Sequence, residues 1–219
     1  MRGMPMERNG QEARSARTRT QLIEAAVEVI GTVGYEGATT RELTKTAKTN
    51  LSAIPYHFGG KRELYLAAAE MVADYAWGRF EEVIDILGNG DAAALEDGLK
   101  YFLHIMLEDA EPHSWTSFVA RCAFDNDEAF ALIHARAIAP VSNRLTEMVA
   151  DLSSGSVDED AVRLRVNAIV TAIIGFRLLR GIMQRGMSCD DLPKSYADQL
   201  RLMIADLCRS DFLGIADRQ

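Results

Sequence analysis

Cysteine is scarce in this sequence, and its three copies are widely spaced. Cys122, Cys189 and Cys208 are odd in number, and no two of them form a CxxC pair. This pattern indicates neither a disulfide framework nor a zinc site. We therefore expect reduced, partly buried thiols and no bound metal.

Long apolar runs are missing as well. The longest run, residues 168–176, is interrupted by Thr171 and falls short of the roughly 18 residues that a membrane span needs. The N-terminal segment MRGMPMERNGQEARSARTRT is polar and lacks the apolar core of a secretory signal. We expect a cytoplasmic protein that has no membrane partner.

Strand signals are absent, because no β-branched run alternates with polar residues between turns. With 5 Pro and 16 Gly in 219 residues, the chain has few helix breakers. Residues 1–14 are polar and without periodicity, and we predict a disordered tail there. The rest predicts an all-α fold of about nine helices, near residues 17–33, 39–48, 51–58, from 61 onward, 91–109, 114–124, 127–152, 158–186 and 194–210.

Catalytic motifs are also lacking. The sequence contains no GxSxG, HExxH, GxGxxG or Walker loop, and its four histidines are scattered. We predict that the protein is not an enzyme and needs no cofactor.

Positive charge is in short supply overall but is concentrated at one end. The formal net charge is −8, yet residues 1–65 hold ten Lys/Arg against seven Asp/Glu, a net +3, and the remainder carries −11. A mildly basic head on an acidic body can face a polyanion with the head alone.

Two short helices joined by a tight turn are expected within this head. Thr39 and Glu42 have the spacing of a capping box at the start of a helix that buries Leu43 and Ala47. Asn50 suits the cap of a further helix over residues 51–58, which the pair Gly59-Gly60 ends. A helix followed by these two is the pattern of a helix-turn-helix unit, whose second short helix enters the major groove of DNA.

The exposed positions of the second short helix suit contacts with DNA. Leu51 can touch thymine methyl groups, and Ser52 can exchange hydrogen bonds with several base edges. Donors on Thr40, Tyr56, His57 and Lys61 suit phosphates, and Arg17 and Arg19 suit the DNA backbone or the minor groove. The complete candidate DNA-binding set is Arg17, Arg19, Thr39, Thr40, Arg41, Asn50, Leu51, Ser52, Ala53, Pro55, Tyr56, His57 and Lys61.

The stretch TTRELTKTAKTNLSAIPYHFGGKRELY resembles the DNA-binding head of the tetracycline-repressor (TetR/AcrR) family. The likeness covers about residues 17–66 and rests on the motif residues Thr39-Thr40, Leu43, Ala47 to Asn50, Tyr56-His57-Phe58, Lys61 and Leu64. It implies that Thr40, Tyr56, His57 and Lys61 contact the DNA backbone and that Leu51, Ser52 and Ala53 read bases.

Two departures from that family pattern stand out. Lys48-Thr49 replaces the usual Gly-Val, so either the turn needs no left-handed glycine or it is slightly altered. Pro55 lies inside the expected helix and should tighten or kink it. The run Asn50 to Ile54 followed by YHFG is similar to a subset of the family with a CerR-like C-terminal domain.

The body contains a helix that is apolar on nearly every side. Residues 158–186 must therefore be covered on two sides, and a second copy of the chain is a simple source of one cover. With the last helix, this segment predicts a four-helix bundle across a two-fold axis, as the family uses. A helix that is merely central in the monomer is the alternative. The expected dimer contacts are Val166, Ile169, Val170, Ile173, Leu200, Met203, Ile204 and Leu207.

Helices over residues 91–152 are expected to enclose a ligand cavity with apolar walls and a few polar groups. Each residue taken singly is more often plain core or surface. The candidates are Phe102, His104, Met106, Trp115, Phe118, Arg121, Phe130, His134, Phe176 and Arg177.

These features together predict a helix-turn-helix DNA-binding domain over residues 15–65 and a ligand-binding and dimerisation domain over residues 66–219. The predicted function is that of a homodimeric transcription repressor. Its partners are a palindromic double-stranded operator, a small-molecule effector and a second copy of the chain. A helical adaptor that binds only proteins is the competing hypothesis, and it predicts no salt-dependent DNA binding.

Overall fold

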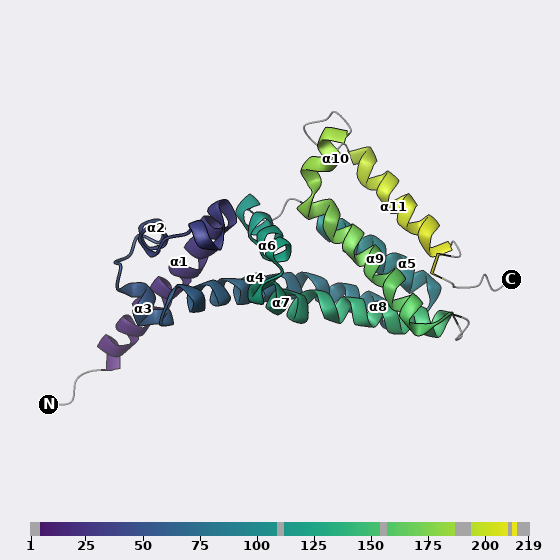
Figure 1. Cartoon of the computed structure of the whole chain (residues 1–219). Coiled ribbons are helices and arrows are strands. Elements are labelled where there is room, and N and C mark those ends of the chain that lie inside the picture. Colours follow the sequence, from purple (N-terminus) through teal and green to yellow (C-terminus); the bar gives the residue numbers. More distant parts are fainter. Residues whose placement is uncertain (1–4, 109–111, 154–156, 187–193, 210–211, 214–219) are drawn as a thin grey trace. The chain divides into compact units, whose positions relative to one another are not determined.

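The computed structural model describes residues 5–108, 112–153, 157–186, 194–209 and 212–213. Within these residues the chain is helical and contains no strand (Figure 1). The all-α prediction is therefore confirmed. Contacts divide the chain into two compact units. Unit 1 comprises residues 1–73 and 111–133, and unit 2 comprises residues 74–110 and 134–219. The sequence instead predicts a single body from residue 66 onward.

Unit 1 is built on one long helix. Its elements are α1 (Pro5–Gly37), α2 (Thr40–Thr46), α3 (Ala53–Phe58), the first half of α4 (Lys61–Ile86), α6 (His113–Asp125) and α7 (Glu128–Ile133). Helices α2, α3 and α6 contact α1 (Figure 1). Leu22, Ile30, Leu43, Ile54 and Leu64 are among the fully buried side chains of its core.

Helix α1 begins earlier than the sequence predicts. It is already helical from Pro5, so the predicted disorder of residues 1–14 differs from the structure over residues 5–14. A helix whose later turns are anchored by buried Leu22 and Val27 can extend at little cost, because each added residue gains one backbone hydrogen bond. The helix is interrupted at Gly34, where φ 79° and ψ 168° suit glycine.

The close approach of α1 and α6 depends on Gly31. A Cβ atom at this position would lie 2.4 Å from the backbone oxygen of Ser114. From α6, the Arg121 guanidinium donates to the carbonyl oxygens of Gly31 (2.9 Å) and Thr32 (2.7 Å). These carbonyls belong to the last turn before Gly34, where helix oxygens need outside donors. Arg121 therefore caps α1.

Unit 2 holds the second half of α4 and the remaining helices. These are η1 (Leu87–Asn89), α5 (Ala92–Leu107), the π-helix η2 (His134–Ile138), α8 (Ala139–Leu152), α9 (Glu159–Leu178), α10 (Arg180–Gly186) and α11 (Lys194–Arg209). Helix α5 contacts α8, α9 and α11. Its side chain Phe102 is fully buried and packs edge-to-face on Phe80 of α4, with ring centres 5.1 Å apart.

Two of the predicted long helices are divided. The segment predicted as one helix over 127–152 forms α7 and α8, separated by the π-turns of η2. The segment predicted as one helix over 158–186 forms α9, which ends at Leu178, and α10, which is bent from α9 by 77°. Leu179 leaves helical geometry at φ −111° and ψ 22°, although it is a good helix former. The predicted loop over 153–156 lies largely outside the described residues.

No single helix in the described ranges is both long enough and apolar enough to cross a membrane. Helices α9 and α10 satisfy that test only when they are taken together across their bend, by length and composition alone.

Candidate nucleic-acid interface

Helix α2 starts where the capping signal predicts. Thr39 is extended, and its hydroxyl oxygen accepts a hydrogen bond from the Glu42 amide at 3.1 Å. Leu43, Thr44 and Ala47 are buried. The Thr44 hydroxyl donates to the carbonyl oxygens of Thr40 and Arg41, so its burial leaves no unpaired donor.

The turn after α2 needs a left-handed residue, and Lys48 supplies it with φ 53°. The turn therefore needs no glycine, as one of the two expectations has it, but it keeps the left-handed conformation at Lys48. The amide of Thr49 donates to the carbonyl oxygen of Thr44 at 2.9 Å, which requires the chain to reverse at Lys48. An L-residue in this region costs about 1–2 kcal/mol relative to a helical conformation.

Helix α3 starts two residues later than predicted. Its cap position is Ser52 rather than Asn50, and the Ser52 hydroxyl donates to the Asn50 side-chain oxygen at 2.7 Å. Pro55 therefore falls in the first turn, where its missing amide would have no helical partner in any case. Gly59, with φ 87°, ends the helix as predicted, and its amide donates to the Pro55 carbonyl at 3.1 Å.

The two faces of α3 differ sharply. Ala53 and Ile54 are buried in the core of unit 1, whereas Leu51 is 55% and Tyr56 is 78% exposed. Ser52 and Pro55 are also exposed. The Tyr56 ring packs edge-on against His57, with ring centres 4.8 Å apart. Ala53 faces inward and is corrected as a base reader, because its methyl group fixes α3 to the core.

Basic side chains next to this face lean on aromatic rings. The Lys61 ammonium lies 4.2 Å from the centre of the Tyr35 ring, and the Arg19 guanidinium lies 5.1 Å from that of Phe58. Such cation–π contacts fix the position of a charge without neutralising it. Arg17, Thr40 and Arg41 are exposed.

A buried polar contact joins α4 to α6 and to Asp127, the residue just before α7, within unit 1. The Tyr65 hydroxyl donates to the Asp127 carboxylate at 2.5 Å and lies 3.1 Å from the Cys122 sulfur, whose S–H it can accept. Burial, followed by the hydrogen bond to Asp127, raises the pKa of Tyr65. Burial also raises the pKa of Cys122 from 9.0 to about 12. The exposed Arg62–Glu128 ion pair joins α4 to α7 itself. Spacing along the sequence gave no signal for this contact.

The predicted ligand-pocket residues are divided between the two units. Trp115, Phe118, Arg121 and Phe130 belong to unit 1, where Phe118 is fully buried and Arg121 caps α1. In unit 2, Phe102 is fully buried, and Met106 and Phe176 pack partly buried on the same core. Phe102 and Phe118 pack in the cores of their units, and their role as pocket walls stays a prediction. The prediction of Arg121 as a ligand anchor is not supported, because its guanidinium donates to carbonyl oxygens of α1.

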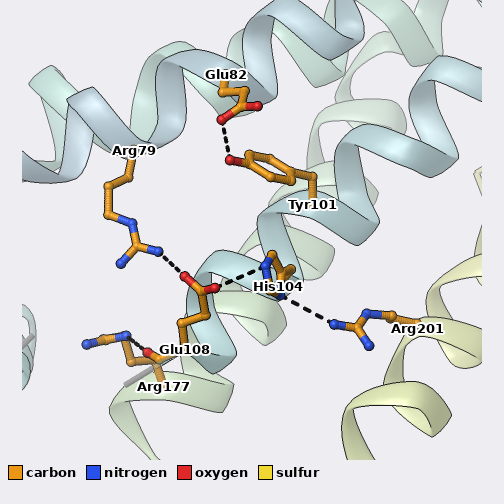
Figure 2. Close-up of polar contacts among 7 residues, drawn as sticks. All are labelled: Arg79, Glu82, Tyr101, His104, Glu108, Arg177 and Arg201. Carbon is orange, nitrogen blue, oxygen red and sulfur yellow. Dashed lines mark hydrogen bonds and ion pairs between the residues drawn. The ribbon is translucent and has the colours of Figure 1, made fainter. Parts of the chain in front are cut away.

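Two of the predicted pocket residues, His104 and Arg177, meet in a polar cluster of unit 2 (Figure 2). The carboxylate of Glu108 accepts from Arg79 at 2.5 Å and from His104 Nε2 at 3.0 Å. Arg177 donates to the Glu108 carbonyl oxygen at 2.7 Å. We call Arg79, His104, Glu108, Arg177 and Arg201 the Glu108 cluster. These residues come from α4, α5, α9 and α11, and Glu108 is the residue that ends α5. In the sequence, only the i,i+4 spacing of His104 and Glu108 indicates that any two of them are neighbours.

His134, a further predicted pocket residue, lies instead at an open groove of about 930 Å³ along α8 and α9. The groove is lined mainly by polar side chains, among them Asn143, Glu147, Arg163 and Asn167.

Most of the predicted dimer contacts face the core of unit 2. Val166, Ile169, Val170, Ile173, Leu200 and Ile204 are buried within the chain, Leu207 is partly buried, and Met203 is exposed. The six buried residues are covered by their own chain, and a dimer contact through them stays a prediction. The opposite side of α9 and α10 carries the exposed apolar side chains, including Leu164, Leu179 and Ile182.

Comparisons with known proteins match both parts of the chain. Residues 22–68 match the family described as bacterial regulatory proteins, tetR family. Residues 92–215, more than half of the chain, match the C-terminal domain of the HTH-type transcriptional dual regulator CecR. The C-terminal domain that the sequence predicts as CerR-like therefore matches the CecR C-terminal domain.

Relatives and a solved structure agree with these matches. The HTH-type transcriptional dual regulator CecR of Shigella flexneri is 29% identical over 170 residues, which cover 73% of this chain and 75% of the relative. The HTH-type transcriptional repressor AcnR of Corynebacterium glutamicum is 35% identical over 100 residues, or 46% of either chain. The structure of AibR in complex with isovaleryl coenzyme A and operator DNA shares the fold with a TM-score of 0.63 at 16% identity, covering 85% of this chain and 97% of AibR.

Two family matches in the expected order, and relatives that are transcriptional regulators, leave one assignment. The chain belongs to the TetR family of bacterial transcriptional regulators, carries a CecR-type C-terminal domain, and is not an enzyme.

Proposed function

We propose that the chain is a homodimeric repressor that holds a near-palindromic operator through two copies of α3 and releases it when a small molecule binds. The observation that carries this proposal is the exposed edge of α3. Leu51 and Tyr56 are large apolar or aromatic side chains that stand out from a helix whose other face is buried. Burying Leu51 in a DNA groove and packing Tyr56 against the DNA backbone recovers free energy that their exposure in the free protein forgoes.

Base reading and backbone contact are assigned to different residues. Leu51, Ser52 and Pro55 lie at the exposed start of α3 and suit base edges and thymine methyl groups. Thr40, Arg41, Tyr56, His57 and Lys61 surround them and suit phosphates. Thr39 and Asn50 act on the protein itself, since both oxygens accept hydrogen bonds that shape α2 and the turn. Arg17 and Arg19 on α1 remain candidates for the DNA backbone.

Dimerisation is proposed through the outer side of α9 and α10. Leu164 is 72%, Leu179 is 55% and Ile182 is 68% exposed. Between them Ala168 and Ala172 are exposed and small, which allows a second helix to approach closely. Two α3 helices about 34–36 Å apart would then meet successive major grooves. Two linked heads also compensate for the small positive charge of each.

The first experiment is a mobility-shift titration of the full-length protein with duplex DNA from upstream of its own gene. We expect binding that weakens steeply as salt rises, because several phosphates are neutralised. Lys61→Ala should weaken binding to all duplexes, and Ser52→Ala should change preference among them. Light scattering should give a dimer, and Leu164→Asp with Ile182→Asp should give monomers. A stable monomer that ignores every duplex would overturn the proposal.

A reporter fused to the same upstream region tests the sign of regulation. Deleting the gene should raise reporter output if the protein represses. A fall in output would show activation and would contradict the repressor assignment while leaving DNA binding intact. Neither the family matches nor any contact among the described residues favours the alternative of an adaptor that binds only proteins.

A further inference from the structure

One acidic residue in unit 2, Glu108, lies among basic side chains from four helices (Figure 2). Glu108 Oε2 accepts from Arg79 Nη2 of α4 at 2.5 Å, and Oε1 lies 3.0 Å from His104 Nε2 of α5. The backbone oxygen of Glu108 accepts from Arg177 Nη1 of α9 at 2.7 Å. Arg201 Nη2 of α11 lies 3.3 Å from His104 Nδ1. Glu108 thus accepts directly from Arg79, His104 and Arg177, whereas Arg201 reaches it only through His104.

The donors are set for an anion. Arginine cannot accept a hydrogen bond, so His104 Nδ1 must accept from Arg201, and its Nε2–H is left to donate to Glu108. Arg201 also donates to Asp198 at 2.8 Å. The Arg79 guanidinium and the His104 Nε2–H both contact the Glu108 carboxylate. Donors of these two kinds recognise carboxylate and phosphate oxygens in general, because both present the same acceptor geometry.

Glu108 can be exchanged for another anion. The side chains of Glu108 and His104 are 43% and 44% exposed, so solvent reaches the cluster. Ion pairs at this exposure contribute little net stability. Glu108 is also the residue that ends α5, and it follows the last helical turn rather than lying inside the helix. Its side chain can leave without breaking a helix.

We propose that the Glu108 cluster is the effector site, that it takes a small molecule bearing a carboxylate or phosphate group, and that Glu108 fills the site until such a molecule displaces it. This inference rests on the proposed ligand-controlled function and names the chemical class of the ligand. Helix α4, which carries Arg79, begins at Lys61 directly after the reading helix. Removing Glu108 from Arg79 therefore changes the contacts of the same helix that follows α3.

Direct binding tests the site without DNA. Calorimetric titrations of the full-length protein would use succinate in one arm and inorganic phosphate in another, with sodium chloride at matched ionic strength as the reference. We expect saturable binding in at least one arm, and the arm that binds distinguishes carboxylate from phosphate. Arg79→Gln and Arg177→Gln should each weaken that binding about tenfold or more.

Glu108→Gln separates a ligand site from a purely structural network. The substitution removes the competing charge, so binding of the preferred anion should tighten several-fold. If the cluster were a purely structural network, Glu108→Gln would instead weaken anion binding, as Arg79→Gln and Arg177→Gln do. Arg163→Gln is the matched control, because Arg163 lies on α9 and pairs with Glu159 on the exposed surface. It should leave binding unchanged.

Three outcomes overturn the inference: no anion binds above the chloride reference, the arginine variants bind as well as wild type, or Glu108→Gln weakens binding. Thermal unfolding of each variant shows that it is folded. Whether the anion makes the protein release its operator is measured separately by mobility shift. Anion binding without DNA binding would leave this site standing and would reject the proposed repressor function.

Discussion

The exposed edge of α3 and the Glu108 cluster differ in what their polar and charged side chains contact. On α3 and its neighbours, Tyr56, Thr40 and Arg41 project from the surface. In the cluster, Arg79, His104 and Glu108 are directed at one another (Figure 2). A surface that binds DNA needs no acidic residue of its own to pair with its donors, because the DNA phosphates and bases supply the acceptors. Basic groups meant for a small molecule are held ready by a carboxylate of the chain itself.

The largest expected effect breaks the α3 side of this comparison. Leu51→Ala combined with Tyr56→Ala should weaken operator binding about a hundredfold or more, because each lost contact with DNA, to a base edge or to the backbone, is worth about 1–3 kcal/mol. Both side chains are more than half exposed, so stability should hardly change. Fluorescence anisotropy with labelled operator measures the loss. Phe124→Ala, at a 92% exposed position on α6, is the matched control and should bind normally.

A second variant tests the support beneath the reading helices. Gly31→Ala forces a Cβ against the Ser114 backbone oxygen, 2.4 Å away, and α1 must move from α6. We expect the free energy of unfolding to fall by about 1–3 kcal/mol, as measured in urea. Gly78→Ala on α4 is the control, since no atom lies within 4 Å of its added Cβ. It should be stabilised by up to about 1 kcal/mol, and equal losses in the two variants would refute the packing argument.

A third, smaller effect depends on pH. The pKa of Cys122 is raised by burial from 9.0 to about 12, so the folded protein keeps this proton at pH values where the unfolded chain loses it. Stability is therefore full below pH 9 and declines as pH rises toward 12. Between pH 8 and pH 10 the loss from this group should be about 1 kcal/mol. Urea unfolding of wild type and Cys122→Ala at both pH values isolates it, and identical slopes would contradict it.

The smallest effect concerns the turn between the two short helices. Lys48→Gly removes the strain of a left-handed L-residue but adds freedom to the unfolded chain. The net gain in unfolding free energy should not exceed about 1 kcal/mol. Lys48→Val, β-branched at the same backbone angles, should lose about 1 kcal/mol or more. Thermal melting of both variants beside wild type measures the difference, and a valine variant as stable as the glycine variant would show that the turn is not strained.

Local chemistry made much of unit 1 predictable. The Thr39 cap, the buried Leu43 and Ala47, and the end at Gly59 all follow from signals within a few residues. The later start of α3 was not predicted, because Asn50 and Ser52 are both good caps and only the three-dimensional fold decides between them. For the same reason, the resemblance predicts Ala53 on the DNA-facing side of α3, whereas the structure buries it.

Long-range contacts explain what the sequence could not give in unit 2. Apolar residues on all sides of 158–186 do not say which side meets the chain's own core. The sequence therefore predicts dimer contacts at Val166 and Ile173, which the structure buries in unit 2. The bend after Leu178 has no Pro or Gly at the break. The Glu108 cluster draws on four helices, and no spacing rule brings Arg79 and Arg201 together.

The position of Pro55 has a consequence for the kinetics of operator search. A six-residue helix does not persist alone in water, yet a proline in its first turn has already fixed one backbone angle, and Ala53 and Ile54 anchor it. Little ordering remains to be done when the protein meets DNA. Association should then be limited by diffusion and charge steering rather than by folding of the reading element, and a peptide copy of α3 alone should not bind.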